Sequence, residues 1–353
     1  MSKELLTALK ELEKERGIPK EALLDALQTA LCTAYKKNFG SAQNVKIDFN
    51  KHNGQVKIYA QKRVVHELSN PLEEITLADA QQININYQVE DLVNVEVTPS
   101  DFGRIAAQTA KQVVVQKLRE VERNMVFDEF SEREGEIVNG FVQRVESKVV
   151  IVDLGRTEGV MLPSDLLPHE YYEVGKRLKG YIYDVKNTTK GPNIFISRSH
   201  PLFLKRLFEL EVPEIYEGKV EIVSIAREPG SRSKISVRAR DESIDAVGAC
   251  VGPRGIRVQN IVAELNGEKI DIIKYESDMA LFIANALSPA QVLSVNLSEE
   301  EKIAMVLVTP EHLSLAIGKE GQNVRLAARL TGWKVDINST DTLLEDFSDV
   351  EEA

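Results

Sequence analysis

One short unit occurs twice in this chain, and it constrains the fold more than any other feature. A Gly-x-x-Gly segment occupies residues 252–255 and again residues 318–321, 66 positions later. Each copy follows a strand-like run and a helical run of small and aliphatic residues. Each then precedes an amphipathic stretch that closes with Gly267 or Gly332 and a Lys-x-Asp-Ile segment. A repeated strand, helix, Gly-x-x-Gly, helix, strand unit predicts two tandem copies of one α/β module.

The glycines indicate that this turn approaches another molecule closely. Without Cβ, and with positive φ accessible, a glycine turn can come near a phosphodiester backbone. The N–H groups that begin the next helix are expected to face solvent, where the helix dipole favours an anion. An ordinary tight helix-turn-helix connection explains either copy alone equally well, but the repetition favours binding. The candidate contacts are Gly252, Pro253, Arg254, Gly255, Ile256, Arg257, Gly318, Lys319, Glu320, Gly321, Gln322 and Arg325.

This arrangement resembles the K-homology (KH) domain. The Gly-x-x-Gly loop of that domain clamps about four nucleotides of single-stranded nucleic acid. The resemblance implies that single-stranded RNA is the ligand of both loops.

Composition limits the remaining possibilities. A chain of 353 residues is too long for one typical core and is expected to form two to four domains. Its first residues are densely charged, and no apolar run approaches the roughly 20 residues of a membrane span, so a soluble, cytoplasmic protein without membrane contact is expected. The two cysteines, Cys32 and Cys250, fall in different modules. Neither a disulfide framework nor a metal site is expected, and no cofactor is implied.

The net charge of −11 is unevenly distributed. Residues 339–353 carry six acidic and no basic residues, and residues 341–353 are predicted to form a disordered acidic tail. The other modules are close to neutral. RNA contact is therefore expected to depend on local clusters and loops and not on a field over a whole domain.

Residues 131–200 show five short strand-like runs separated by glycines, which predicts a small closed barrel of the OB type. The order Gly-x-Val, an aliphatic strand ending Asp-x-Gly, Glu-Gly-Val-x-Leu-Pro and a closing Ile-x-x-Ser-Arg resembles the RNA-binding barrel named after ribosomal protein S-one. That family commonly stacks bases on second-strand aromatics, where this chain has residues 147–150, Ser-Lys-Val-Val. Phe141, Tyr181 and Tyr183 are the candidate barrel contacts, with a place in the barrel core as the alternative.

The first 130 residues follow a different pattern. Leucines at helical spacing from Leu5 predict one helix, and Pro19 opens a second that carries Leu23, Leu27 and Leu31. Strand-like runs at 45–48, 56–59 and 92–97 follow, with a hairpin turn at residues 53–54. A long helix then carries an apolar stripe, with basic residues that are either a solvated face or part of a rigid connection. The stripe comprises Ile105, Ala110, Val113, Val114, Leu118, Val121 and Met125.

This order of modules resembles the NusA family of bacterial transcription factors over nearly the whole chain. The resemblance implies a multidomain α+β protein with an RNA-polymerase-binding domain (1–130), an S-one barrel (131–200), two KH domains (201–277 and 278–340) and the tail (341–353). It also implies a monomer that docks on RNA polymerase near the RNA exit and holds nascent single-stranded RNA. Such a protein would modulate pausing, termination and antitermination, with other antitermination factors as partners.

No enzyme is expected, and no residue is a candidate for catalysis. The sequence has no phosphate-binding loop of the Gly-x-x-x-x-Gly-Lys-Ser/Thr kind, no His-Glu-x-x-His and no Gly-x-Ser-x-Gly elbow, and its five histidines are scattered. A ribosome-assembly or translation-associated RNA-binding factor is the alternative, and an RNA-processing enzyme is a more distant one.

Overall fold

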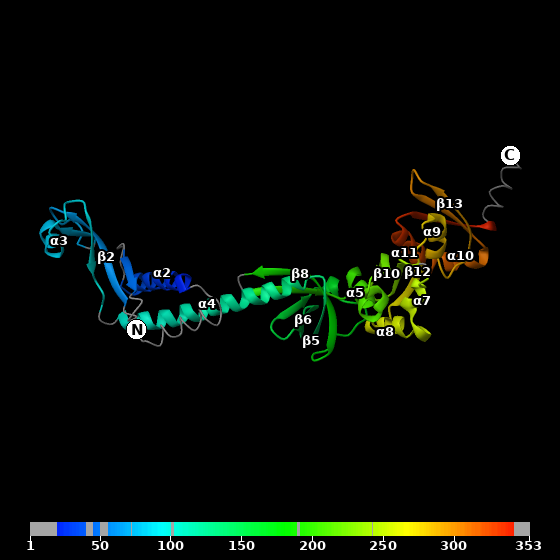
Figure 1. Cartoon of the computed structure of the whole chain (residues 1–353), viewed down its shortest axis with the longest axis horizontal. Coiled ribbons are helices and arrows are strands. Elements are labelled where there is room, and N and C mark those ends of the chain that lie inside the picture. The colour runs from blue at the N-terminus through cyan, green and yellow to red at the C-terminus, as the bar shows by residue number, and fades with distance from the viewer. Residues whose placement is uncertain are drawn as a thin grey trace. The chain divides into compact units, whose positions relative to one another are not determined.

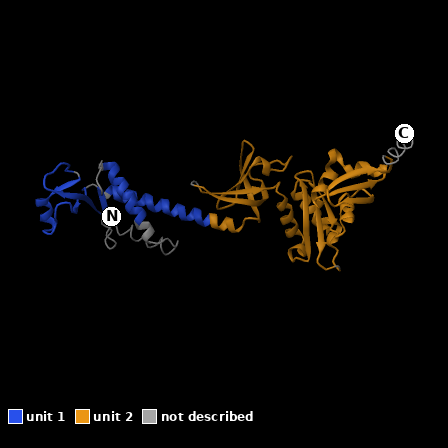
Figure 2. Ribbon diagram, turned by 90° about the horizontal axis from the view of Figure 1, so that it is seen from above, with its two compact units in different colours: residues 1–126 blue, residues 127–353 orange. Residues whose placement is uncertain are grey.

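The structure, a computed structural model, describes residues 20–39, 45–49, 56–71, 73–99, 102–188, 191–241 and 243–341. Contacts divide the chain into two compact units, residues 1–126 and 127–353 (Figure 2). The boundary falls inside the long helix α4 (Phe102–Glu132), so one helix contributes to both units. The helix expected around Leu5, the turn at residues 53–54 and nearly all of the acidic tail lie outside the described residues.

The first unit is an α/β domain with one main core. Leu27 and Leu31 of α2 pack with Ile47 and Ile58 of the sheet and with Phe102 at the start of α4. Strand β2 pairs with β1, β3 and β4. The elements besides α4 are α2 (Lys20–Phe39), β1 (Val45–Phe49), β2 (Val56–Val65), β3 (Glu74–Thr76), α3 (Leu77–Ile83) and β4 (Leu92–Glu96).

Most of these elements match the sequence prediction, with two exceptions. The prediction omits β3 and α3, because a strand of three half-buried residues shows no alternation and α3 is only seven residues long. The predicted apolar stripe of α4 is used unevenly. Of its residues, Ala110 is buried and Met125 is exposed, and those between them are half-buried. Among the described residues, the main core of the first unit therefore ends near Ala110.

A closed barrel of five strands begins the second unit, as the sequence predicts. The strands are hydrogen-bonded in the order β5-β6-β7-β9-β8, and β8 closes on β5. Alternate residues point inward, as Val138 and Val142 of β5 do, together with Ile182 of β8 and Ile194 of β9. The strands are β5 (Ile137–Glu146), β6 (Val149–Asp153), β7 (Glu158–Met161), β8 (Arg177–Thr188) and β9 (Gly191–Ser197).

Two modules of the same topology follow the barrel (Figure 1). In each, an antiparallel strand pair is extended by a third strand parallel to the middle one, and the Gly-x-x-Gly segment joins two helices. The first has α5 (Pro201–Glu211), α6 (Pro213–Tyr216), β10 (Val220–Glu228), β11 (Arg232–Ala239), α7 (Ala246–Val251), α8 (Ile256–Glu264) and β12 (Lys269–Lys274). The second has α9 (Met279–Ala286), β13 (Val292–Ser298), β14 (Ile303–Val308), α10 (Pro310–Ile317), α11 (Gln322–Thr331) and β15 (Lys334–Ser339).

The cores of the second unit cross the expected module boundaries. Leu167 and Tyr181 of the barrel belong to the core cluster of the first Gly-x-x-Gly module. Ala226 and Ile273 of that module in turn belong to the core of the second. The multidomain α+β fold class is confirmed, while the exact division at residues 130, 200, 277 and 340 remains a prediction.

Candidate nucleic-acid interface

The two Gly-x-x-Gly loops have the same backbone conformation. Gly252 and Gly318 have φ/ψ of 72°/174° and 75°/172°, and Gly255 and Gly321 have 75°/12° and 73°/15°. The residue before each second glycine, Arg254 or Glu320, is also left-handed, with φ of 53° and 54°. Three positive φ values in four residues are rare for L-residues, and their repetition confirms that both glycine pairs serve one turn geometry.

The two glycines of a loop are required for different reasons. A Cβ at Gly252 would lie 2.6 Å from Cγ of Arg257, and one at Gly318 would lie 2.7 Å from Cβ of Asn323. The first glycine therefore lets the next helix pack closely. A Cβ at Gly255 would meet only Gln259, at 3.7 Å, and one at Gly321 would meet nothing within 4 Å. The second glycine leaves open space at the surface, where a ligand can approach.

One side chain braces each loop from the following helix. Arg257 donates through Nη1 to the carbonyl of Ala249 at 2.6 Å and pairs with Glu214 at 2.9 Å. Asn323 occupies the corresponding position of the second loop and donates to the carbonyls of Leu315 and Ala316, each at 3.1 Å. Arg257 is an RNA contact in the sequence prediction, and the structure places it in a structural role.

Asn323 is absent from the predicted site. Alignment of the two repeats places Asn323 opposite Arg257, two residues after the second glycine of its loop. Comparison of the repeats could therefore have identified Asn323 as a loop residue. Its side chain also donates to the carbonyl of Leu287 at 2.9 Å and is buried. This residue therefore determines the shape of the second loop from within.

The exposed part of each loop carries one basic side chain. Pro253, Arg254, Lys319 and Glu320 are exposed, as is Ile256, at 53%. Among the residues that the structure describes, the side chains of Arg254 and Lys319 have no hydrogen-bond or ion-pair partner, which leaves both cations available to a phosphate. In the second loop the carboxylate of Glu320 offsets the charge of Lys319, so the first loop is the more positive.

Fewer loop amides are available than the sequence predicts. The N–H of Gly255 donates to the carbonyl of Gly252 at 3.0 Å, and the N–H of Gly321 donates to that of Gly318 at 3.1 Å. The next residues, Ile256 and Gln322, donate back within the same turns. The expectation that the first helical N–H groups face solvent is wrong at these positions. Arg254, Lys319 and the helix dipoles remain available to attract an anion.

Gln322 and Arg325 contact the first module. Arg325 forms a bidentate pair with Glu228 of β10, with Nε to Oε1 at 2.6 Å, and Gln322 donates to Oε2 of Glu228 at 2.8 Å. The bond from Arg325 holds the pKa of Glu228 below its usual value. Both residues are predicted RNA contacts that the structure places in an internal network.

The three barrel aromatics have separate environments. Tyr181 is buried and stacks on His200, with ring centroids 4.9 Å apart, so of its two predicted roles the structure favours a place in the core. The hydroxyl of Tyr183 donates to Asp165, and burial raises the pKa of Tyr183 to about 12. Phe141 is 54% exposed on β5, beside Arg177 of the paired strand β8. Of the three, Phe141 presents an open ring to solvent.

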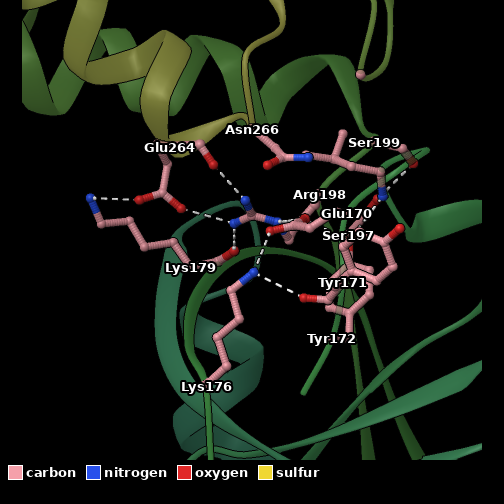
Figure 3. Close-up of polar contacts among 12 residues, drawn as sticks. Glu170, Tyr171, Tyr172, Lys176, Lys179, Ser197, Arg198, Ser199, Glu264 and Asn266 are labelled. Carbon is pink, nitrogen blue, oxygen red and sulfur yellow. Dashed lines mark hydrogen bonds and ion pairs between the residues drawn. The ribbon is translucent and has the colours of Figure 1, made fainter.

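Arg198 joins the barrel to the first Gly-x-x-Gly module, as Figure 3 shows. Its guanidinium donates to Glu170 and to the carbonyl of Lys179 in the barrel, at 2.8 and 2.7 Å. It also donates to the carboxylate and the carbonyl of Glu264 in α8, at 2.9 and 2.6 Å. Since Arg198 is 1% exposed, this junction is a buried ionic network that holds the loop-bearing helix against the barrel.

Two properties of the described residues bear on the chemistry of the chain. No group of three or more His, Cys, Asp or Glu side chains there is arranged to hold a metal ion. None of the helices found there is both long and apolar enough to cross a membrane.

Family models match the first unit and both Gly-x-x-Gly modules. The model of the NusA N-terminal domain matches residues 4–124. The model of the NusA-like first KH domain matches residues 198–275, and that of the NusA-like second KH domain matches residues 279–345. Each Gly-x-x-Gly module thus coincides with a KH match.

Whole-length relatives agree as well. The chain is 55% identical to the transcription termination/antitermination protein NusA of Halalkalibacterium halodurans, over 96% of this chain and 89% of that protein. It is 56% identical to the Bacillus subtilis protein of the same name, over 96% and 91%. The Thermus thermophilus protein of that name is 40% identical over 100% and 93%. Together with the paired loops, these matches establish that the chain belongs to the NusA family.

Proposed function

We propose that this chain is a transcription termination/antitermination factor that captures nascent single-stranded RNA with its two KH loops while its first unit docks on RNA polymerase near the RNA exit. One observation carries the RNA assignment. Two loops of matching conformation each present an open glycine beside a basic side chain, Arg254 or Lys319, that has no partner within the described part of the chain. The names of the relatives support the transcriptional role.

Each loop would make only a few contacts with the RNA. About four nucleotides fit one KH loop, and each exposed cation neutralises one phosphate. Docking of the first unit raises the effective concentration of the loops at the emerging transcript, so weak contacts become useful. Phe141 beside Arg177 is a candidate place for one further base to stack.

Several finer points remain predictions. Docking near the RNA exit, other antitermination factors as partners and a monomeric state are expected from the family resemblance, and a cytoplasmic location is expected from the composition. A role in ribosome assembly stays the alternative, and stable co-purification with a ribosomal subunit in place of polymerase would favour it.

An RNA-binding measurement tests the loops. We expect Gly255→Asp and Gly321→Asp each to weaken binding of single-stranded RNA roughly five- to tenfold, the effect of about 1 to 1.4 kcal/mol of repulsion at a phosphate. Aspartate tolerates the left-handed conformation better than most residues, so the fold should persist.

Gly332→Asp is the matched control. Gly332 ends α11 with φ of 74°, and a Cβ at this position would meet nothing within 4 Å. The variant therefore adds the same charge and similar strain away from the loop, and it should bind RNA as the parent does. Unchanged affinity in the Gly255→Asp/Gly321→Asp double variant, with circular dichroism intact, would refute the KH clamp.

A further inference from the structure

Glu228, the last residue of β10 in the first KH domain, contacts the second KH domain at three side chains. Its carboxylate accepts from Nε and Nη2 of Arg325 at 2.6 and 3.2 Å and from Gln322 at 2.8 Å. Arg329 lies farther away, with Nη1 3.8 Å from Oε1. The Glu228 side chain is 20% exposed, whereas the Arg325 and Arg329 side chains are 44% and 56% exposed, so the cluster lies at the surface and weakens as salt rises.

The contacts continue from Glu228 to the second Gly-x-x-Gly loop. Nη1 of Arg325 donates to the carbonyl of Glu320 at 3.1 Å, and Glu320 is the left-handed non-glycine residue of that loop. Gln322 is the first residue of α11, directly after the loop, and also donates to Oγ of Ser231 in the first domain. A carboxylate of one KH domain is therefore linked through one guanidinium to the RNA loop of the other.

We propose that Glu228 is a positioning residue for RNA binding by the second KH loop. Through this carboxylate, the first KH domain influences the RNA affinity of the loop in the second KH domain. This inference rests on the proposed function, because it assumes that the second loop binds RNA.

The occupancy of the Arg325 guanidinium favours positioning over direct RNA contact. Three of its five N–H groups donate, two of them to Glu228 and one to the Glu320 carbonyl. The first loop has Gln259 at the corresponding position, four residues after its second glycine, so the arginine brace is specific to the second loop. Because Gln259 is neutral, the first loop has no equivalent ionic link at this position.

The experiment measures binding of a fluorescein-labelled eight-nucleotide single-stranded RNA of mixed sequence to the full chain. Glu228→Gln is placed in two backgrounds, Gly255→Asp, where only the second loop is intact, and Gly321→Asp, where only the first is intact. Glutamine keeps the shape but cannot form the charge-assisted bidentate pair. We expect Glu228→Gln to weaken binding roughly three- to tenfold in the Gly255→Asp background and to leave it unchanged in the Gly321→Asp background.

This selectivity separates positioning from a general structural role. Glu228 belongs to the first domain, so simple destabilisation would affect the first loop at least as strongly. Glu221→Gln is the matched control, since Glu221 lies on the same strand and pairs with Arg238 inside the first domain, at 3.1 Å. It should change binding in neither background. Arg325→Gln removes the same link from the other side and should repeat the selectivity of Glu228→Gln.

Three results would overturn the inference. Equal losses in both backgrounds would indicate general destabilisation. Tighter binding after Glu228→Gln would mean that Glu228 withholds Arg325 from RNA, the reverse of positioning. Unchanged binding in both would show that the link does not act on the loop. If instead neither aspartate background binds RNA more weakly than the parent, the proposed RNA function fails, and this inference fails with it.

Discussion

Each loop contains one glycine that packs against its own helix and one that faces open space. At Gly318 a Cβ would lie 2.7 Å from Cβ and 2.8 Å from the backbone nitrogen of Asn323, and neither atom can move without shifting α11. At Gly321 the same atom would meet nothing within 4 Å. A substitution at Gly318 should therefore lower the stability of the fold, whereas one at Gly321 should weaken RNA binding.

An alanine substitution at Gly318 measures the effect on stability. Gly318→Ala should lower the free energy of unfolding by about 2–6 kcal/mol. This range combines backbone strain of about 1–3 kcal/mol, because φ of 75° with ψ of 172° suits essentially glycine alone, with overpacking of about 1–3 kcal/mol. Gly332→Ala is the comparison, because Gly332 has φ of 74° with ψ of 16°, a left-handed conformation that costs about 1–2 kcal/mol, and its surroundings are open. Denaturant unfolding of both variants checks the difference. Equal losses would mean that the close approach of Asn323 is unimportant.

The elements that carry these residues explain which basic groups remain for RNA. In helix α8, Arg257 holds the first Gly-x-x-Gly loop. In helix α11, Arg325 holds the second. Arg254 and Lys319, at the loop tips, have no such partner within the described part of the chain. Charge close to a loop is therefore a poor guide to RNA contact unless its internal partners are known.

Salt dependence distinguishes the two kinds of basic residue. Arg254→Ala and Lys319→Ala should each flatten the log–log dependence of RNA affinity on salt by about 0.7, the value for one lost single-strand phosphate contact. Arg257→Ala should leave this slope nearly unchanged and lower stability instead, since Glu214 and the Ala249 carbonyl lose their partner. Titrations at several salt concentrations check this. A slope change for Arg257→Ala equal to that for Arg254→Ala would contradict the assignment.

His200, which caps the N-terminus of α5, should make the second unit sensitive to acid. His200 accepts the N–H of Leu202 at Nδ1 and stacks on Tyr181, while Asp165 and the Arg227 guanidinium lie nearby. Burial, and then Arg227, lower the pKa of His200. Below about pH 6.5 the unfolded chain therefore binds a proton that the folded chain resists, and stability falls as pH falls.

The variant His200→Asn tests this pH dependence. Asparagine caps a helix with its side-chain oxygen but does not titrate in this range. The free energy of unfolding should fall less between about pH 7 and pH 5.5 in His200→Asn than in the parent, as followed by denaturant unfolding at each pH. Parallel pH profiles for the two proteins would exclude His200 as the source.

For the whole molecule, the repeat made much of the fold predictable. The spacing of the two loops and their flanking strands predicts both modules, because local sequence determines turns and strands. The site was less predictable, because the partners of Arg257 and Arg325 lie 43 and 97 residues away in the sequence. The burial of Tyr181 likewise depends on the core that the barrel shares with the first KH domain. Such contacts arise only when the modules pack together.

The arrangement of the second unit also bears on function at this scale. Arg198 ties the barrel to the first KH domain through a buried network, and Glu228 ties the first KH domain to the second. The three modules therefore form one compact unit, in which both loops belong to the same body. If the first unit docks on polymerase as proposed, this body would act on the transcript as a single tethered clamp.

The most direct test of RNA capture is an in vitro transcription assay at a hairpin-dependent terminator, with polymerase from the same source and a modest concentration of the full chain. The Gly255→Asp/Gly321→Asp double variant is compared with the parent and with Gly332→Asp, and binding to polymerase is measured in parallel. We expect the double variant to bind polymerase normally but to lose most of the effect on termination, while Gly332→Asp retains it. A double variant that alters termination as strongly as the parent would contradict RNA capture by the paired loops.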